Sequence, residues 1–170
     1  TAIVICSVHT PQGDPFIGDP RNVLLRALER AAEMGFSFKT GMELEFFLFR
    51  DGPEGGRRGL TPQDDASYFD ISDNLTQRIS REMISTLIGL GIEVDSSHHE
   101  IGSGQHEMDF DYNPALTSAD HVLTARVALR NVALRNHLHC TFMPRPSADL
   151  PGSGMHTHQS LHDLRTDANV

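Results

Sequence analysis

The sequence predicts an α/β or α+β domain, in which amphipathic helices of about 16–20 residues interrupt short apolar strands. Of its 170 residues, 38% are apolar and 22% are charged, which is the balance of a globular protein with one hydrophobic core. No apolar run approaches the ~20 residues that a helix needs to cross a bilayer, so we expect no membrane association.

Three segments have the apolar spacing of amphipathic helices. Asp19 is a good N-cap and Pro20 suits a first turn, so the first helix begins there and ends at Gly35. The second helix is expected at 73–90 and the third at 117–136. The stripes expected to face the core are Leu75, Ile79, Met83 and Leu87 in the second helix and Val122, Ala125, Leu129 and Val132 in the third.

Strands are predicted where β-branched and aromatic residues run together between turn residues. The expected strands are residues 3–8, 40–49, 92–98, 106–112, 139–143 and 154–161. Segments 51–66 and 144–152, which are rich in Pro together with other turn residues, are predicted loops.

Net charge, the first residues and the distribution of histidines each give a separate expectation about this protein. A net charge of −9 argues against nucleic-acid binding, which needs a basic face. The chain starts without Met, directly in an apolar run, so we expect it to be part of a longer protein. Nine of the ten histidines lie between His98 and His162, which favours a search for a metal site in that half.

Two carboxylates, Glu43 and Glu45, interrupt an otherwise strongly apolar strand. Residues two apart in a strand point to the same face, so these side chains project side by side and repel unless a positive group lies between them. The alternative is a solvent-facing edge that alternates with buried Met42, Leu44 and Phe46, although such flanks are more hydrophobic than those of an ordinary surface strand.

Two Glu/His clusters flank a Gly-Ser-Gly turn in segment 98–107, which reads His-His-Glu-Ile-Gly-Ser-Gly-Gln-His-Glu. The turn can close a tight hairpin and bring Glu100 close to Glu107. Carboxylates with a few imidazoles suit Mg²⁺ or Mn²⁺ better than they suit metals that prefer thiolates. A metal site and a purely polar hairpin are both compatible with this segment.

His156 and His158 alternate on a predicted strand and therefore share one face. The glycines just before them permit close backbone approach to a ligand. Either one histidine binds a metal and the other a phosphate, or both are exposed to solvent.

In order and spacing, these segments resemble the glutamine synthetase family, type I. The resemblance covers essentially the whole chain. It rests on Glu-x-Glu-Phe-Phe-Leu-Phe at 43–49, His-His-Glu and Gly-Gln-His-Glu within 98–107, Thr-Phe-Met-Pro-Arg-Pro at 141–146 and Gly-Ser-Gly-Met-His-Thr-His at 152–158, with Gly-Asp-Pro-Arg at 18–21. It implies that residues 1–170 are a partial catalytic domain with a curved, mainly antiparallel sheet and flanking helices. It also implies that the family's N-terminal β-grasp domain and the C-terminal part of its catalytic domain lie outside these residues.

The resemblance implies an ATP-dependent carbon–nitrogen ligase with Mg²⁺ or Mn²⁺. In this family ATP phosphorylates the γ-carboxylate of glutamate, and ammonia then displaces the phosphate to form glutamine. Members are cytoplasmic and form dodecamer-like homo-oligomeric rings. A γ-glutamyl ligase for a polyamine or another amine, and a non-catalytic paralogue, are the alternatives. The family's active-site arginines and glutamate flap are expected outside this chain, and half of the family's site is built from another subunit. We therefore expect the chain alone to be inactive.

The motifs also imply residue roles, with no residue assigned as acid, base or nucleophile. Glu45, Glu100 and Glu107 match the ligands of the metal on the amino-acid side, and Glu43 and His156 match ligands of the metal that bridges the ATP phosphates. The positions that match the nucleotide site are Tyr68, Asp95, Tyr112, His158 and Ser160, while Gly152 lies in the loop that contacts the substrate glutamate.

Three positions depart from the pattern of many members. Pro151 stands where many have Asn, Arg145 where many have Lys, and Asp95 where many have Glu. These differences leave the metal motif intact and bear instead on strict specificity for glutamate and ammonia.

Overall fold

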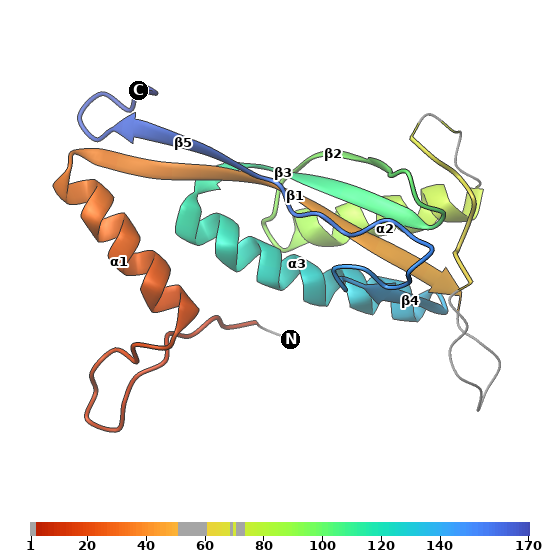
Figure 1. Ribbon diagram of the computed structural model, residues 1–170, viewed down its shortest axis with the longest axis horizontal. Coiled ribbons are helices and arrows are strands. Elements are labelled where there is room, and N and C mark those ends of the chain that lie inside the picture. The colour runs from red at the N-terminus through yellow and green to blue at the C-terminus, as the bar shows by residue number, and fades with distance from the viewer. Residues whose placement is uncertain (1–2, 51–60, 69, 71–73) are drawn as a thin grey trace. The chain divides into compact units, whose positions relative to one another are not determined.

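The computed structural model describes residues 3–50, 61–68, 70 and 74–170, which form two compact units. One unit comprises residues 1–41, 112–121 and 158–170, and the other comprises 42–111 and 122–157. The elements in chain order are α1 (Pro20–Glu33), β1 (Phe36–Arg50), α2 (Asn74–Gly89), β2 (Val94–His99), β3 (Gln105–Pro114), α3 (Ala115–Arg135), β4 (Leu138–Thr141) and β5 (Thr157–Asp163) (Figure 1).

The strands form one sheet in the order β2-β3-β1-β4, and β5 also pairs with β1. β1 and β4 run antiparallel with Phe47 opposite Thr141, and β2 and β3 run antiparallel with His98 opposite Glu107. The predicted mixed α/β class is therefore confirmed. The strand pairs β1–β4 and β2–β3 are antiparallel.

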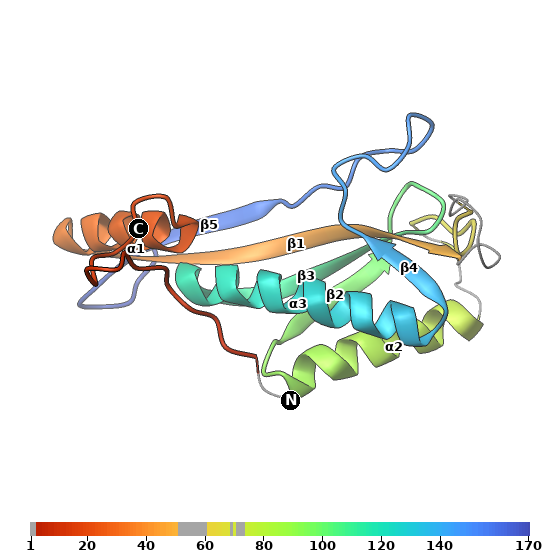
Figure 2. The same cartoon turned by 90° about the horizontal axis from the view of Figure 1, so that it is seen from below.

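The core of the larger unit lies between the sheet and two helices. Leu44, Phe46 and Leu48 alternate along β1 and belong to the buried cluster. Figure 2 shows α2 and α3 on the same side of the sheet. All but one of the residues in their predicted apolar stripes are confirmed as buried. The buried residues are Ile79, Met83, Leu87, Val122, Ala125, Leu129 and Val132.

The exception is Leu75, whose side chain is 40% exposed while Thr76 is buried. The Thr76 hydroxyl donates to Asp64 Oδ2 at 2.6 Å and lies 3.2 Å from the Gln63 side-chain nitrogen. These polar contacts give the first turn of α2 a buried threonine, which apolar spacing alone does not predict.

The smaller unit is held together by polar contacts. Asp19 caps α1 as predicted, accepting from the Arg21 amide at 3.0 Å, and Gly35 follows the helix with a φ of +91°. Arg21 forms an ion pair with Asp120 at 3.0 Å. The Ser118 hydroxyl donates to the Thr40 carbonyl at 2.9 Å.

The predicted strand at 3–8 is wrong. These residues form no strand, and Val4 is 77% exposed. The Val8 amide donates instead to the Asp19 carboxylate at 2.9 Å, and the Val8 carbonyl accepts from Phe16. High β-propensity is not sufficient for a strand, because a strand also needs a neighbour with which to share its backbone hydrogen bonds.

Other predicted boundaries shift. β1 begins at Phe36, four residues early, and β5 begins at Thr157 rather than at 154. Gly154 and His156 nevertheless accept hydrogen bonds from the Glu45 and Glu43 amides at 3.2 and 3.0 Å. Residues 51–60 of the predicted loop and position 73 of the predicted helix lie outside the described residues. None of the helices in the described ranges is long and apolar enough to cross a membrane.

The core packing of α3 predicts unequal effects of two identical substitutions. Leu129 is fully buried, whereas Leu134 on the same helix is 63% exposed. Leu129→Ala should lower the free energy of unfolding by about 2–5 kcal/mol, and Leu134→Ala should change it by less than about 0.5 kcal/mol. Chemical denaturation measures both, and equal losses would contradict this packing.

Candidate functional site

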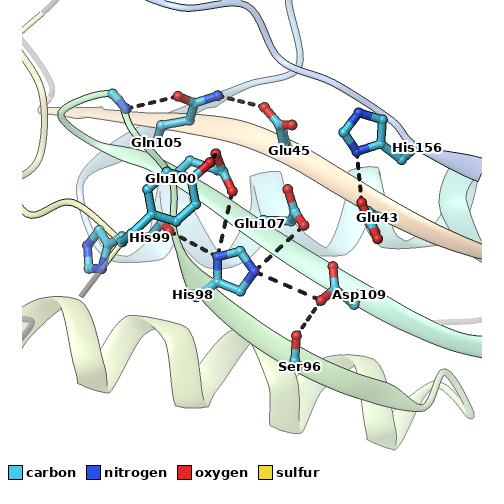
Figure 3. A network of polar contacts seen from close by, with 12 residues as sticks. Glu43, Glu45, Ser96, His98, His99, Glu100, Gln105, Glu107, Asp109 and His156 are labelled. Atoms are coloured by element: carbon cyan, nitrogen blue, oxygen red, sulfur yellow. Dashed lines mark hydrogen bonds and ion pairs between the residues drawn. The ribbon is translucent and has the colours of Figure 1, made fainter. Parts of the chain in front are cut away.

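The candidate site is formed by side chains of β1 and β3 that point away from the core. Leu44 and Phe46 of β1, like Met108 of β3, are buried in the core. Their neighbours in sequence therefore point to the opposite face, where Figure 3 shows Glu43, Glu45, Glu107 and Asp109 gathered. The prediction that Glu43 and Glu45 share a face is thus confirmed.

The hairpin between β2 and β3 brings Glu100 and Glu107 together. The Glu100 amide donates to the Gln105 carbonyl at 2.9 Å, and the Gln105 amide donates to the Gly102 carbonyl at 2.8 Å. Gly104 has a φ of +68°, and a Cβ there would lie 2.6 Å from the Leu48 carbonyl oxygen. Only glycine fits at this position, which explains the second glycine of the Gly-Ser-Gly sequence.

Glu107 is at the centre of the cluster. Potential ligand atoms of His98, Glu100 and Glu107 all lie within 4.8 Å of one another. The same holds for a second group, which consists of Glu43, Glu107 and Asp109. His98 is 3.7 Å from both Glu100 and Glu107 through its two ring nitrogens. Two members, His98 and Asp109, were not predicted as site residues.

Gln105 fixes the position of Glu45. Its side-chain nitrogen donates to Glu45 Oε2 at 2.7 Å and to the Gly152 carbonyl at 2.9 Å, and its side-chain oxygen accepts from the Gly102 amide at 3.1 Å. Gln105 is 1% exposed. A Cβ on Gly154 would lie 2.6 Å from Glu45 Oε1, so a larger residue here would displace this carboxylate.

His156 joins the cluster through Glu43. Its Nδ1 lies 2.8 Å from Glu43 Oε2, and its backbone carbonyl accepts from the Glu43 amide at 3.0 Å. The His156 ring is otherwise open to solvent, with 71% of its side chain exposed. The five predicted metal ligands, Glu45 among them, thus come from β1, the β2–β3 hairpin and the segment just before β5 (Figure 3).

The cluster carries more negative charge than its protein surroundings balance. Within the described part of the chain, Glu100 and Glu107 form ion pairs only with His98. Burial raises the pKa of Glu107 to about 8, helped by its hydrogen bond with Asp109 and by the charges of Glu100 and Glu43. Asp109 accepts from the Ser96 hydroxyl through one oxygen, while its Oδ1 is buried without a hydrogen-bond partner among the described residues.

This donor set fits a hard divalent cation. Carboxylate oxygens with one or two imidazoles are ligands that Mg²⁺ and Mn²⁺ accept, and a cation would also satisfy the orphaned Asp109 oxygen.

The residues predicted for the nucleotide site lie in both units. The Tyr68 hydroxyl donates to Glu100 at 2.5 Å, and this bond, together with burial, raises the pKa of Tyr68 to about 12. Asp95 is exposed at an irregularity in β2. Tyr112, His158 and Ser160 belong to the smaller unit, where Ser160 lies 2.5 Å from the His162 ring.

A buried polar layer lies on the core side of the hairpin, and it was not predicted. His99 and His106 are opposite each other in the register, and His106 stacks on Phe46 with 5.7 Å between ring centroids. Burial opposes ionisation of Asp64, but hydrogen bonds with His99 and Thr76 outweigh it and hold its pKa at about 2. Burial, reinforced by His99, lowers the pKa of His106 to about 4, so this imidazole is neutral at pH 7.

Strand alternation was the signal for this layer. In His98-His99 and in His106-Glu107, one residue of each pair must face the core.

Comparison with known proteins places this geometry in one family. The family model for the catalytic domain of glutamine synthetase matches residues 17–170. The glutamine synthetases of Clostridium saccharobutylicum and Thermus thermophilus are each 45% identical to the chain, over 161 and 162 residues. Each alignment covers 94% of this chain but 36% of the relative, so the chain spans just over a third of their length.

Solved structures agree. A complex of GmaS with ADP is 36% identical with a TM-score of 0.81, covering 96% of this chain and 37% of the other. A cryo-EM structure of Plasmodium falciparum glutamine synthetase, 22% identical, has a TM-score of 0.84 over 97% of this chain and 38% of its own, which shows the shared fold. The chain belongs to the glutamine synthetase family.

Proposed function

We propose that the whole protein is a glutamate–ammonia ligase, which forms glutamine from glutamate, ammonia and ATP through a γ-glutamyl phosphate. The observation that carries this proposal is the convergence of the family's carboxylate and histidine motifs on one face of the sheet, around Glu107. Membership of the glutamine synthetase family over residues 17–170 supports the same reaction.

In this proposal Glu45, Glu100 and Glu107 hold one Mg²⁺ or Mn²⁺, and Glu43 and His156 contribute to a second. Such ions supply charge neutralisation and alignment for phosphoryl transfer. The surplus negative charge of the cluster and the unsatisfied Asp109 oxygen support an oxygen-ligated cation here.

The chain's own contribution is to orient these ligands. Gln105 fixes Glu45 by a 2.7 Å hydrogen bond, and Tyr68 fixes Glu100 by one of 2.5 Å. Groups that hold a ligand's second oxygen set its direction and its basicity. Tyr68 is therefore assigned an orienting role beside its expected place in the nucleotide site.

The remaining assignments follow from the family motifs. We assign Asp95, Tyr112, His158 and Ser160 to the nucleotide site and the Gly152 loop to the substrate glutamate. Homo-oligomeric rings are the proposed assembly of the whole protein. The chain alone should show no turnover, because further site residues of this family lie outside the span that it matches.

An amine-acceptor screen of the full-length protein tests the reaction. ADP release with glutamate should be fastest with ammonia, and polyamines and other primary amines should give little. A clear preference for one of those amines would instead identify a γ-glutamyl-amine ligase. Absence of ADP release with every acceptor tested would instead identify a non-catalytic paralogue.

Cation binding by the chain should depend on Glu107. Glu107→Gln keeps the side-chain shape but removes the charge that both carboxylate sets share, so the Kd for Mn²⁺ should rise at least about tenfold. Isothermal titration of this chain measures the effect. Glu29→Gln, at an exposed position of α1, removes one charge elsewhere and should leave the Kd unchanged. Equal Mn²⁺ affinity in both variants would refute the metal assignment.

In the full-length enzyme, Glu107→Gln should reduce turnover more than His158→Asn does. His158 is assigned one contact to the nucleotide phosphates, worth roughly 1–3 kcal/mol, or about one to two decades in rate. Steady-state kinetics across a Mg²⁺ and Mn²⁺ titration separate the two. Near-normal turnover of Glu107→Gln beside a dead His158→Asn would mean that the roles are wrongly assigned.

A further inference from the structure

Two arginines on α3 share one aromatic ring. Arg126 and Arg130 are one helical turn apart, and their guanidinium carbons lie 5.2 and 5.1 Å from the centroid of the Phe142 ring. The ring face attracts each cation but leaves both charges in place. Two like charges are therefore held beside one another.

Neither arginine forms an ion pair with any described residue, whereas Arg135, further along the same helix, pairs with Glu82 at 2.8 Å. Among the described residues, the buried Nε of Arg126 has no hydrogen-bond partner, and the same holds for the buried Ser153 hydroxyl oxygen. Buried donors are almost always satisfied in folded proteins, so two unsatisfied ones at one place point to a ligand.

Arg126 and Ser153 are both lining residues of one cavity of about 110 Å³ in the larger unit. A water molecule takes up about 30 Å³ in the liquid, so this space admits a polyatomic ion rather than a single water. Phe142 and Leu44 supply apolar walls. Glu45 also lines the cavity, but one of its oxygens is bound by Gln105, and the two arginines outnumber it in charge.

We propose that Arg126, Arg130 and Ser153 form a binding site for a small oxyanion, a carboxylate or a phosphate. The Arg126 guanidinium and the Ser153 hydroxyl donate to the anion, and Arg130, over the same Phe142 ring, adds a second positive charge nearby. Guanidinium groups favour such oxygens because they donate charge-assisted hydrogen bonds in a fixed plane. The site borders the carboxylate cluster, with which it shares Glu45, but it does not rest on the ligase proposal.

Two-dimensional ¹H–¹⁵N NMR of this chain tests the site, with inorganic phosphate and acetate titrated separately at constant ionic strength. Saturable shifts are expected at the Arg126 Nε–H and at the Ser153 and Gly154 amides. A response to phosphate alone identifies a phosphoryl ligand, and a response to acetate alone identifies a carboxylate.

The Arg126→Met variant keeps the apolar stem but removes the charge, so it should weaken binding at least about tenfold. Arg81→Met removes an exposed arginine on α2 and should have no effect. Ser153→Ala, which changes no charge, should weaken binding about threefold and serves if Arg126→Met does not fold. Absence of saturable shifts at these groups, or equal affinity in the Arg81 variant and both site variants, would overturn the proposal.

Discussion

Everything at this site depends on the alternation of side chains along β1 and β3. Leu44 and Phe46 must enter the core that α2 and α3 cover, so Glu43 and Glu45 are forced to the other face. The antiparallel register then sets His98 opposite Glu107. The same hydrophobic packing that stabilises the fold thus concentrates carboxylates, because no strand can shift by one residue without burying them.

This concentration of charge opposes folding unless a cation offsets it. The folded-state pKa of Glu107 is raised to about 8, so its ionisation is unfavourable in the folded chain. Its contribution to stability is therefore complete at low pH and is lost as the pH rises towards 8. A bound divalent cation reverses that penalty, and for this reason metal binding and folding should be linked in this protein.

Much of the site could be predicted from sequence because it follows local rules. Period-two alternation placed Glu43 beside Glu45, and the Gly-Ser-Gly turn brought Glu100 to Glu107. Gln105 and Asp64 could not be found in this way. Gln105 matters because of what it reaches, Glu45 and the Gly152 carbonyl, and these contacts join segments that lie far apart in sequence.

The wrong strand prediction at residues 3–8 has the same origin, because a strand is defined by its partner and not by its own composition.

Anomalous diffraction from a crystal soaked in Mn²⁺ tests the central claim, that the carboxylate face is a divalent-cation site, most directly. The account predicts an anomalous peak at bonding distance from a Glu107 carboxylate oxygen. A peak among Asp64, His99 and His106 instead, or no peak near Glu107, would contradict it.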